Sequence, residues 1–125
     1  MSGHDPAYLW RFLLVGYAIT VLIEAPVLAV GLAPRHGWSV RAIASLWLTA
    51  CTYPIVVLVL PLTVEPWWGR TAYVTIAEIF APLAECLLFW FAFDRTSPRV
   101  DQRRDALAII AANLASFLIG VWLFR

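Results

Sequence analysis

Three glutamates, Glu24, Glu78 and Glu85, lie within long runs of apolar residues. A charged side chain at the centre of a membrane-spanning helix costs about 2.5–3.5 kcal/mol, so such a residue usually faces the inside of a bundle and serves a function there. Removing a carboxylate from water favours its protonated form, and a second carboxylate nearby strengthens that preference. Carboxyl groups in this setting are candidates for binding and releasing protons or cations.

Hydroxyl and amide side chains recur at the depth of two of these glutamates. With a rise of about 1.5 Å per residue, one polar residue of each apolar segment lies about 10–13 Å from the same end of the predicted bundle. These residues are Glu24, Thr49, Glu85 and Asn113. Helical spacing adds further polar residues to the same stripes, which predicts a polar layer around the bundle axis. The predicted layer consists of Glu24, Glu85, Asn113, Thr49, Glu78, Thr52 and Ser116.

Glu24 and Glu85 are expected to share one site within this layer. Two unpaired carboxylates in a medium of low dielectric constant repel each other, so at least one of the two should be protonated at neutral pH. Glu78 lies about one and a half helical turns further along its segment, where it would extend the polar path.

The elements that would position these side chains are four apolar segments, over residues 8–33, 42–62, 71–93 and 105–124. Each is close to the ~20 residues that a helix needs to cross about 30 Å of hydrocarbon. The 125-residue chain is 62% hydrophobic and 14% charged, which excludes a soluble enzyme, a disordered chain and a coiled coil. Runs this long do not fit the short alternating strands of a β-barrel. The sequence predicts a single all-α domain over residues 1–125, a bundle of four transmembrane helices in the lipid bilayer.

Arginines predict the orientation of this bundle. The first and third connections, 34–41 and 94–104, carry six of the nine arginines, and short basic loops remain in the cytoplasm. Both termini and the connection 63–70 are therefore expected outside. Tryptophans near the predicted span ends are typical of the aromatic belt at the membrane surface. A net charge of +1 leaves no basic surface for nucleic acid.

Other residues that could do chemistry have simpler interpretations. His4 and His36 lie near span ends and are expected to be solvated or interfacial, and the third connection is expected to be a solvated loop. Cys51 and Cys86 lie in apolar runs and are expected to pack as small hydrophobic residues, without a disulfide or a metal. No motif identifies a cofactor. Prolines inside three segments (Pro26, Pro54 and Pro82) would each free a carbonyl at the polar depth, where a cavity could form.

The two halves of the chain have similar spacings. Glu24 and Thr49 are 25 residues apart, and Glu85 and Asn113 are 28 residues apart. The pairs Glu24–Thr52 and Glu85–Ser116 differ by the same three residues, 28 against 31. One longer connection in the second half explains both differences. The spacings predict two similar helical hairpins related by a pseudo-twofold axis along the membrane normal.

Several short motifs resemble those of an uncharacterised family of small four-helix bacterial integral membrane proteins. They are Ile-Glu-Ala-Pro at 23–26, Thr-Ala-Cys-Thr-Tyr-Pro at 49–54, the glutamates of the third segment, and the stretches 103–107 and 113–120. The resemblance implies a location in the bacterial inner membrane. It brings no established activity.

Three functions fit these observations. Buried carboxyl, hydroxyl and amide groups favour a small transporter, or a transporter component, for a cation or a proton-coupled solute. The alternatives are an accessory subunit of a larger membrane complex and, with less support, a membrane-embedded enzyme that modifies lipids. No catalytic constellation of nucleophile and base is present. Ala108, Ala112 and Ala115 form a small-residue face that predicts a homo-oligomer or a larger assembly.

Overall fold

A computed structural model of the chain describes residues 6–123, and these residues form helices joined by short connections. The first helix is α1 (Pro6–Gly31). The second begins as α2 (Trp38–Pro54) and continues through the π-helical η1 (Ile55–Val59) into α3 (Leu60–Thr63). The third is α4 (Glu65–Phe89), extended by the π-helical η2 (Trp90–Asp94), and the fourth is α5 (Arg99–Leu123). Four of these stretches are long and apolar enough to cross a membrane, which confirms the predicted all-α bundle of four helices.

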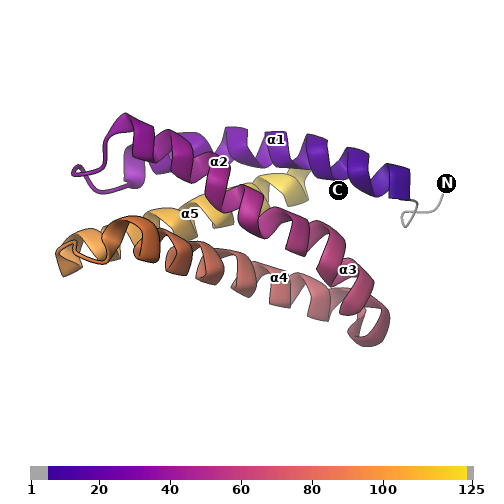
Figure 1. The fold of residues 1–125 in the computed structure, drawn as a ribbon. Coiled ribbons are helices and arrows are strands. Elements are labelled where there is room, and N and C mark those ends of the chain that lie inside the picture. The colour runs from indigo at the N-terminus through magenta and orange to yellow at the C-terminus, as the bar shows by residue number, and fades with distance from the viewer. Residues whose placement is uncertain (1–5, 124–125) are drawn as a thin grey trace.

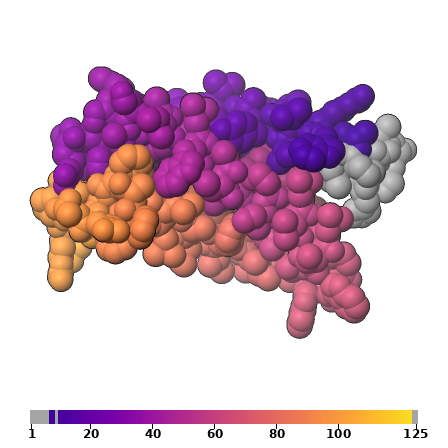
Figure 2. Space-filling view, viewed as in Figure 1, coloured from indigo at the N-terminus to yellow at the C-terminus, as the bar shows by residue number. Residues whose placement is uncertain are grey.

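The four helices form a closed ring. α1 packs against α2 and α5, and α4 packs against the same two helices, so α1 and α4 lie on a diagonal (Figure 1). α1 begins and α5 ends at the end of the bundle where α3 turns into α4, which we call the turn end (Figure 1). The connections 32–37 and 95–98 lie at the opposite end, which we call the loop end. In the space-filling view, α2 and α4 pack together along the face turned to the viewer (Figure 2).

The connections are shorter than the sequence predicted. α2 begins at Trp38 and α5 at Arg99, so several residues assigned to loops are helical. Charged residues extend these helices beyond their apolar segments, which hydrophobicity alone does not detect. At the turn end, Gly69 has a φ of 88° and interrupts the helical conformation within Glu65–Phe89. The predicted connection 63–70 is therefore a tight helical turn. Phe124, the predicted end of the last span, lies outside the described residues.

The best-packed part of the bundle lies toward the loop end. Its buried cluster consists of Leu28, Leu32, Ala44, Leu48, Phe89, Ala108, Ile109 and Ala112. Small residues allow α1 and α5 to approach closely here, because a Cβ added at Gly31 would lie 2.9 Å from the Cβ of Ala108. Two of the three alanines predicted to mediate self-association, Ala108 and Ala112, are thus buried within the bundle. These two alanines therefore cannot contact a second copy of the chain, and self-association remains a prediction.

Proline affects the second helix differently from the others. α1 and α4 stay α-helical through Pro26 and Pro82. The segment directly after Pro54 is π-helical, and the Tyr73 hydroxyl donates a 2.8 Å hydrogen bond to the Val56 carbonyl within it. A side chain of the neighbouring helix thus hydrogen-bonds to a backbone carbonyl of the π-helical segment.

Candidate functional site: a buried carboxyl layer

The Glu24 carboxyl group links three helices. Its side chain projects from α1 and only 2% of the residue is exposed. The Thr49 hydroxyl of α2 lies 3.4 Å from Oε1, and the Ser116 hydroxyl of α5 lies 2.7 Å from Oε2. Both helices that pack against α1 therefore contribute a hydroxyl to this carboxyl group.

The Glu85 carboxyl group has corresponding partners. Glu85 projects from α4 and is 3% exposed. The Thr52 hydroxyl of α2 lies 3.0 Å from its Oε2, and the Asn113 side chain of α5 lies within interaction range. The two carboxyl groups are also close enough to interact electrostatically, although they come from diagonally opposite helices. The structure thus brings together six of the seven residues of the predicted layer.

Two of the hydroxyl groups have a second contact that changes what the layer can do. Ser116 Oγ lies 3.0 Å from the Asn113 carbonyl oxygen, and Thr52 Oγ1 lies 3.1 Å from the Leu48 carbonyl oxygen. A hydroxyl group has one proton to donate and can also accept a hydrogen bond. Each hydroxyl can therefore donate to a carboxylate, or donate to its own backbone carbonyl and accept from a carboxylic acid. The layer accommodates both protonation states of each glutamate without moving a side chain.

No basic side chain neutralises these carboxyl groups within residues 6–123. The ion pairs in this part of the chain join His36 to Asp94 and Asp105, and Arg70 to Glu65. A carboxyl group away from water and from a cation is stable when it is protonated or when it binds a cation.

Glu78, the seventh residue of the predicted layer, is half-buried, has no hydrogen bond to the other six described residues, and lies close enough to Glu24 for the two carboxyl groups to interact electrostatically. It lines an open pocket of about 820 Å³ toward the turn end, together with Glu65, Arg70 and Tyr73. Ser116 lines the same pocket and also contacts Glu24. The pocket thus reaches from the turn end to the edge of the carboxyl layer.

A second polar cluster lies at the loop end, where we predicted solvated residues. His36 is 6% exposed, and its Nε2 lies 2.8 Å from Asp105 Oδ2 and 3.3 Å from Asp94 Oδ1. Asp94, Ser97 and Asp105 are buried as well. The prediction of a solvated His36 is therefore wrong, because the two loops fold over one another and bury His36 together with Asp94 and Ser97. The rest of the third connection is largely exposed, including its four arginines, as a solvated loop should be. His4, the other histidine, lies outside the described residues.

No family model, curated protein or solved structure matches this chain. The resemblance to small bacterial four-helix proteins stays a prediction that rests on short motifs. What the layer can do is therefore inferred from its own chemistry. That chemistry consists of two carboxyl groups, three hydroxyl groups and one amide at one depth of a bundle whose outer surface is apolar.

One end of the carboxyl layer is closed by the core. Phe89, one helical turn after Glu85, is buried, and its ring meets His36 edge-on with ring centroids 5.1 Å apart. Phe93 packs on Phe89 with centroids 5.0 Å apart. Aromatic side chains therefore separate the carboxyl layer from the loop-end cluster, whereas the pocket approaches the layer from the turn end.

Proposed function

We propose that this small polytopic membrane protein moves protons, or a cation in exchange for protons, through the layer formed by Glu24 and Glu85. The observation that carries the proposal is the double contact of Ser116 and Thr52. Each hydroxyl touches a carboxyl oxygen and a backbone carbonyl oxygen, so the hydrogen bonds of the layer persist when a glutamate gains or loses its proton.

Access from one side supports this proposal. The pocket at the turn end is lined by Glu65 and Arg70 near its mouth and by Glu78 and Ser116 deeper in the bundle. A proton or cation entering there meets Glu78 before Glu24. Passage to the loop end requires a change of the packing around Phe89. In the proposed mechanism the Phe89 ring therefore alternates between a position that blocks the path to the loop end and a position that opens it.

The pattern of contacts also supports the predicted repeat. Under the spacing of the two halves, Glu24, Thr49 and Thr52 correspond to Glu85, Asn113 and Ser116. The contact Glu24–Thr49 then corresponds to Glu85–Asn113, and Glu24–Ser116 corresponds to Glu85–Thr52. Two hairpins related in this way would present equivalent carboxyl groups to one path, which suits a site that is approached in turn from two sides.

Proton flux into proteoliposomes tests the proposal directly. The wild-type protein is reconstituted with a pH-sensitive dye inside, and a potassium diffusion potential drives flux. We expect the flux to exceed that of empty vesicles and to fall at least about tenfold in Glu24→Gln and in Glu85→Gln, because the amide keeps the shape of a protonated glutamate but cannot exchange a proton.

Asp101→Asn is the matched control, because Asp101 is a carboxyl residue in the first turn of α5, outside the layer. It should leave the flux unchanged. Repeating the assay with sodium or potassium gradients identifies a cation that exchanges for protons. Wild-type flux no greater than that of empty vesicles under every gradient, or full flux in both glutamine variants, would refute the proposal.

The proposed orientation places the loop end in the cytoplasm. Ser97 is buried at the loop end and is a poor position for a reporter, whereas Thr96 beside it and Thr63 at the turn end are exposed. In a background without native cysteines, we expect Thr96→Cys to react with an impermeant maleimide only after the membrane is opened, and Thr63→Cys to react in intact cells. The opposite labelling would reverse the orientation and leave the four spans unchanged.

A further inference from the structure

Three potential metal ligands converge at the loop end from three parts of the chain. His36 lies in the connection after α1, Asp94 at the end of η2, and Asp105 in the second turn of α5. One ligand atom from each lies within 4.8 Å of the other two. In a tetrahedral site with metal–ligand bonds of about 2.0–2.2 Å, ligand atoms are about 3.2–3.6 Å apart. The 3.3 Å and 2.8 Å separations from His36 Nε2 to the two carboxylates are close to that geometry.

Charge balance in this cluster requires either a proton shared by Asp94 and Asp105 or a further cation. Even with a protonated imidazole, two carboxylates leave one negative charge in an almost completely buried place. Within residues 6–123 no arginine forms an ion pair with either aspartate. Arg35 donates to the Ser97 hydroxyl and Arg41 donates to backbone carbonyls. A divalent cation bound to a neutral imidazole and two carboxylates would remove this imbalance.

Outer hydrogen bonds hold the two carboxylates in place. The backbone N–H of Ala33 donates to Asp105 Oδ1 at 2.7 Å, which leaves Oδ2 facing His36. The Ser97 hydroxyl donates to Asp94 Oδ1 at 2.8 Å, and Gln102 fixes the same loop by donating to the Asp94 and Ser97 carbonyl oxygens. Partners of this kind orient the ligands of metal sites in proteins.

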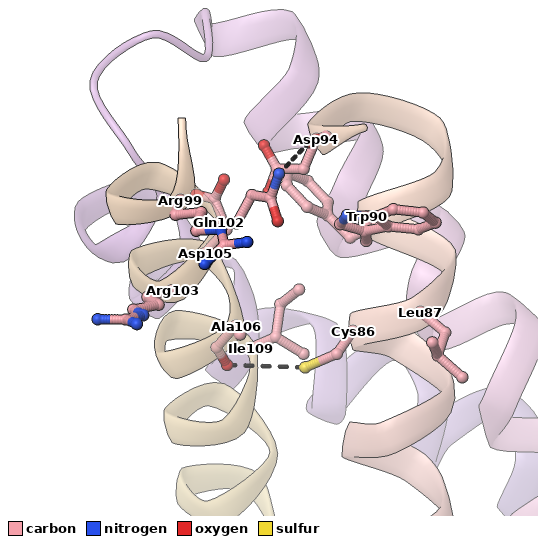
Figure 3. Close-up of a pocket in the computed structure, with 11 residues that line it drawn as sticks. Cys86, Leu87, Trp90, Asp94, Arg99, Gln102, Arg103, Asp105, Ala106 and Ile109 are labelled. Atoms are coloured by element: carbon pink, nitrogen blue, oxygen red, sulfur yellow. Dashed lines mark hydrogen bonds between the residues drawn. The ribbon is translucent and has the colours of Figure 1, made fainter. Parts of the chain in front are cut away.

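The cluster is open to one side. A pocket of about 390 Å³ between the end of α4 and α5 is lined by Asp94, Asp105, Gln102 and two arginines, Arg99 and Arg103 (Figure 3). The pocket would let an ion enter, and it leaves room for a water molecule or an anionic group as an additional ligand. Three protein ligands and one open position are typical of a metal that binds exchangeable ligands.

We propose that His36, Asp94 and Asp105 bind one divalent transition-metal ion, with Zn²⁺ as the best match to one imidazole and two carboxylate ligands. This site is distinct from the carboxyl layer and does not depend on the proposed transport of protons. The adjacent Arg99 and Arg103 would favour an anionic group, such as a phosphate, on the open side of the metal.

Equilibrium binding of Zn²⁺ to the purified protein tests the proposal. The full chain is stripped with a chelator in mild detergent and titrated with Zn²⁺ by calorimetry. The same protein is then titrated with Co²⁺, whose visible spectrum reports the ligands. We expect one ion per chain and a Co²⁺ spectrum of nitrogen and oxygen ligands without a sulfur charge-transfer band, although Cys86 also lines the pocket.

Asp105→Asn and His36→Gln should each weaken Zn²⁺ binding by at least about 100-fold, while Asp101→Asn, a carboxylate outside the cluster, should bind as the wild type does. Circular dichroism and gel filtration establish that each variant is folded. Where a variant is not, the Co²⁺ spectrum of the wild type decides alone. No stoichiometric binding by the wild type, or equal affinity in Asp105→Asn and Asp101→Asn, would overturn the proposal and leave the cluster as a hydrogen-bonded link between two loops.

Discussion

Replacing Phe89 with alanine is expected to lower the free energy of unfolding in detergent by about 2–3 kcal/mol. Phe89 is among the largest fully buried side chains of the described chain and packs against His36 and Phe93. In a membrane protein the transfer from water contributes little, so most of this cost comes from the cavity left behind. Denaturation with sodium dodecyl sulfate measures it.

Leu83→Ala is the matched control for this substitution. Leu83 lies on the same helix but is 58% exposed, on the outer surface of the bundle. Its truncation should change the free energy of unfolding by less than about 0.5 kcal/mol. Equal effects of the two substitutions would show that Phe89 does not pack as described.

The Phe89→Ala variant should also conduct protons passively. Phe89 stands between Glu85 and the His36 cluster, and the cavity left by its ring would have polar groups at both ends. Such a cavity can hold water, which a purely apolar cavity excludes. We expect a proton leak several-fold above that of Leu83→Ala in the proteoliposome assay. An unchanged leak would place the barrier elsewhere.

Arg41→Ala should have a comparable effect on stability, a loss of about 2–3 kcal/mol. The last turn of α1 carries no basic residue, and its final carbonyls have no partners within the helix. The Arg41 side chain of α2 donates to the carbonyls of Ala29 and Ala33 at 2.8 Å and to that of Leu32 at 3.2 Å. Its Nε also donates to the His36 carbonyl at 3.0 Å, which joins α1, the first connection and α2.

Two further substitutions make this prediction specific. Arg41→Lys keeps the charge but offers a compact ammonium in place of the planar guanidinium, so it should recover only part of the stability. Arg11→Ala removes an exposed arginine and should change the thermal midpoint by no more than about 1 °C. A full recovery by lysine would mean that charge alone matters, and a stable Arg41→Ala would contradict the capping role.

The carboxyl layer could be predicted from the sequence because it depends on the regular geometry of α-helices. A constant rise along each helix gave the depth of Glu24 and Glu85, and a constant rotation placed Thr49 and Thr52 on one stripe. Long apolar runs predicted the four spans for the same reason. The position of Glu78 toward the turn end also followed from its distance along the helix.

The loop-end cluster could not be predicted in the same way. At about 100° per residue, nine residues along a regular helix would point Asp94 away from the face that carries Glu85. The wide turn of η2 alters this rotation and brings Asp94 to the buried side. His36 becomes buried only because the first connection folds under the third, a contact between residues 69 apart in the sequence in the case of Asp105. A usable signal was present, since His36, Asp94 and Asp105 all flank connections on the same side of the bundle.

A π-helical turn is equivalent to one extra residue inserted into an α-helix. The turn at Trp90–Asp94 is therefore a difference of length as well as of shape. A related protein in which the acids corresponding to Glu85 and Asp94 were eight positions apart instead of nine would have a regular helix there. It would keep the glutamate layer and reach its third connection in nearly the same rotation, because eight regular helical residues turn about as far as nine residues that include a π-helical turn. The π-helical turn therefore lets the chain carry one additional lipid-facing residue, such as Phe91, without turning Asp94 away from the buried side.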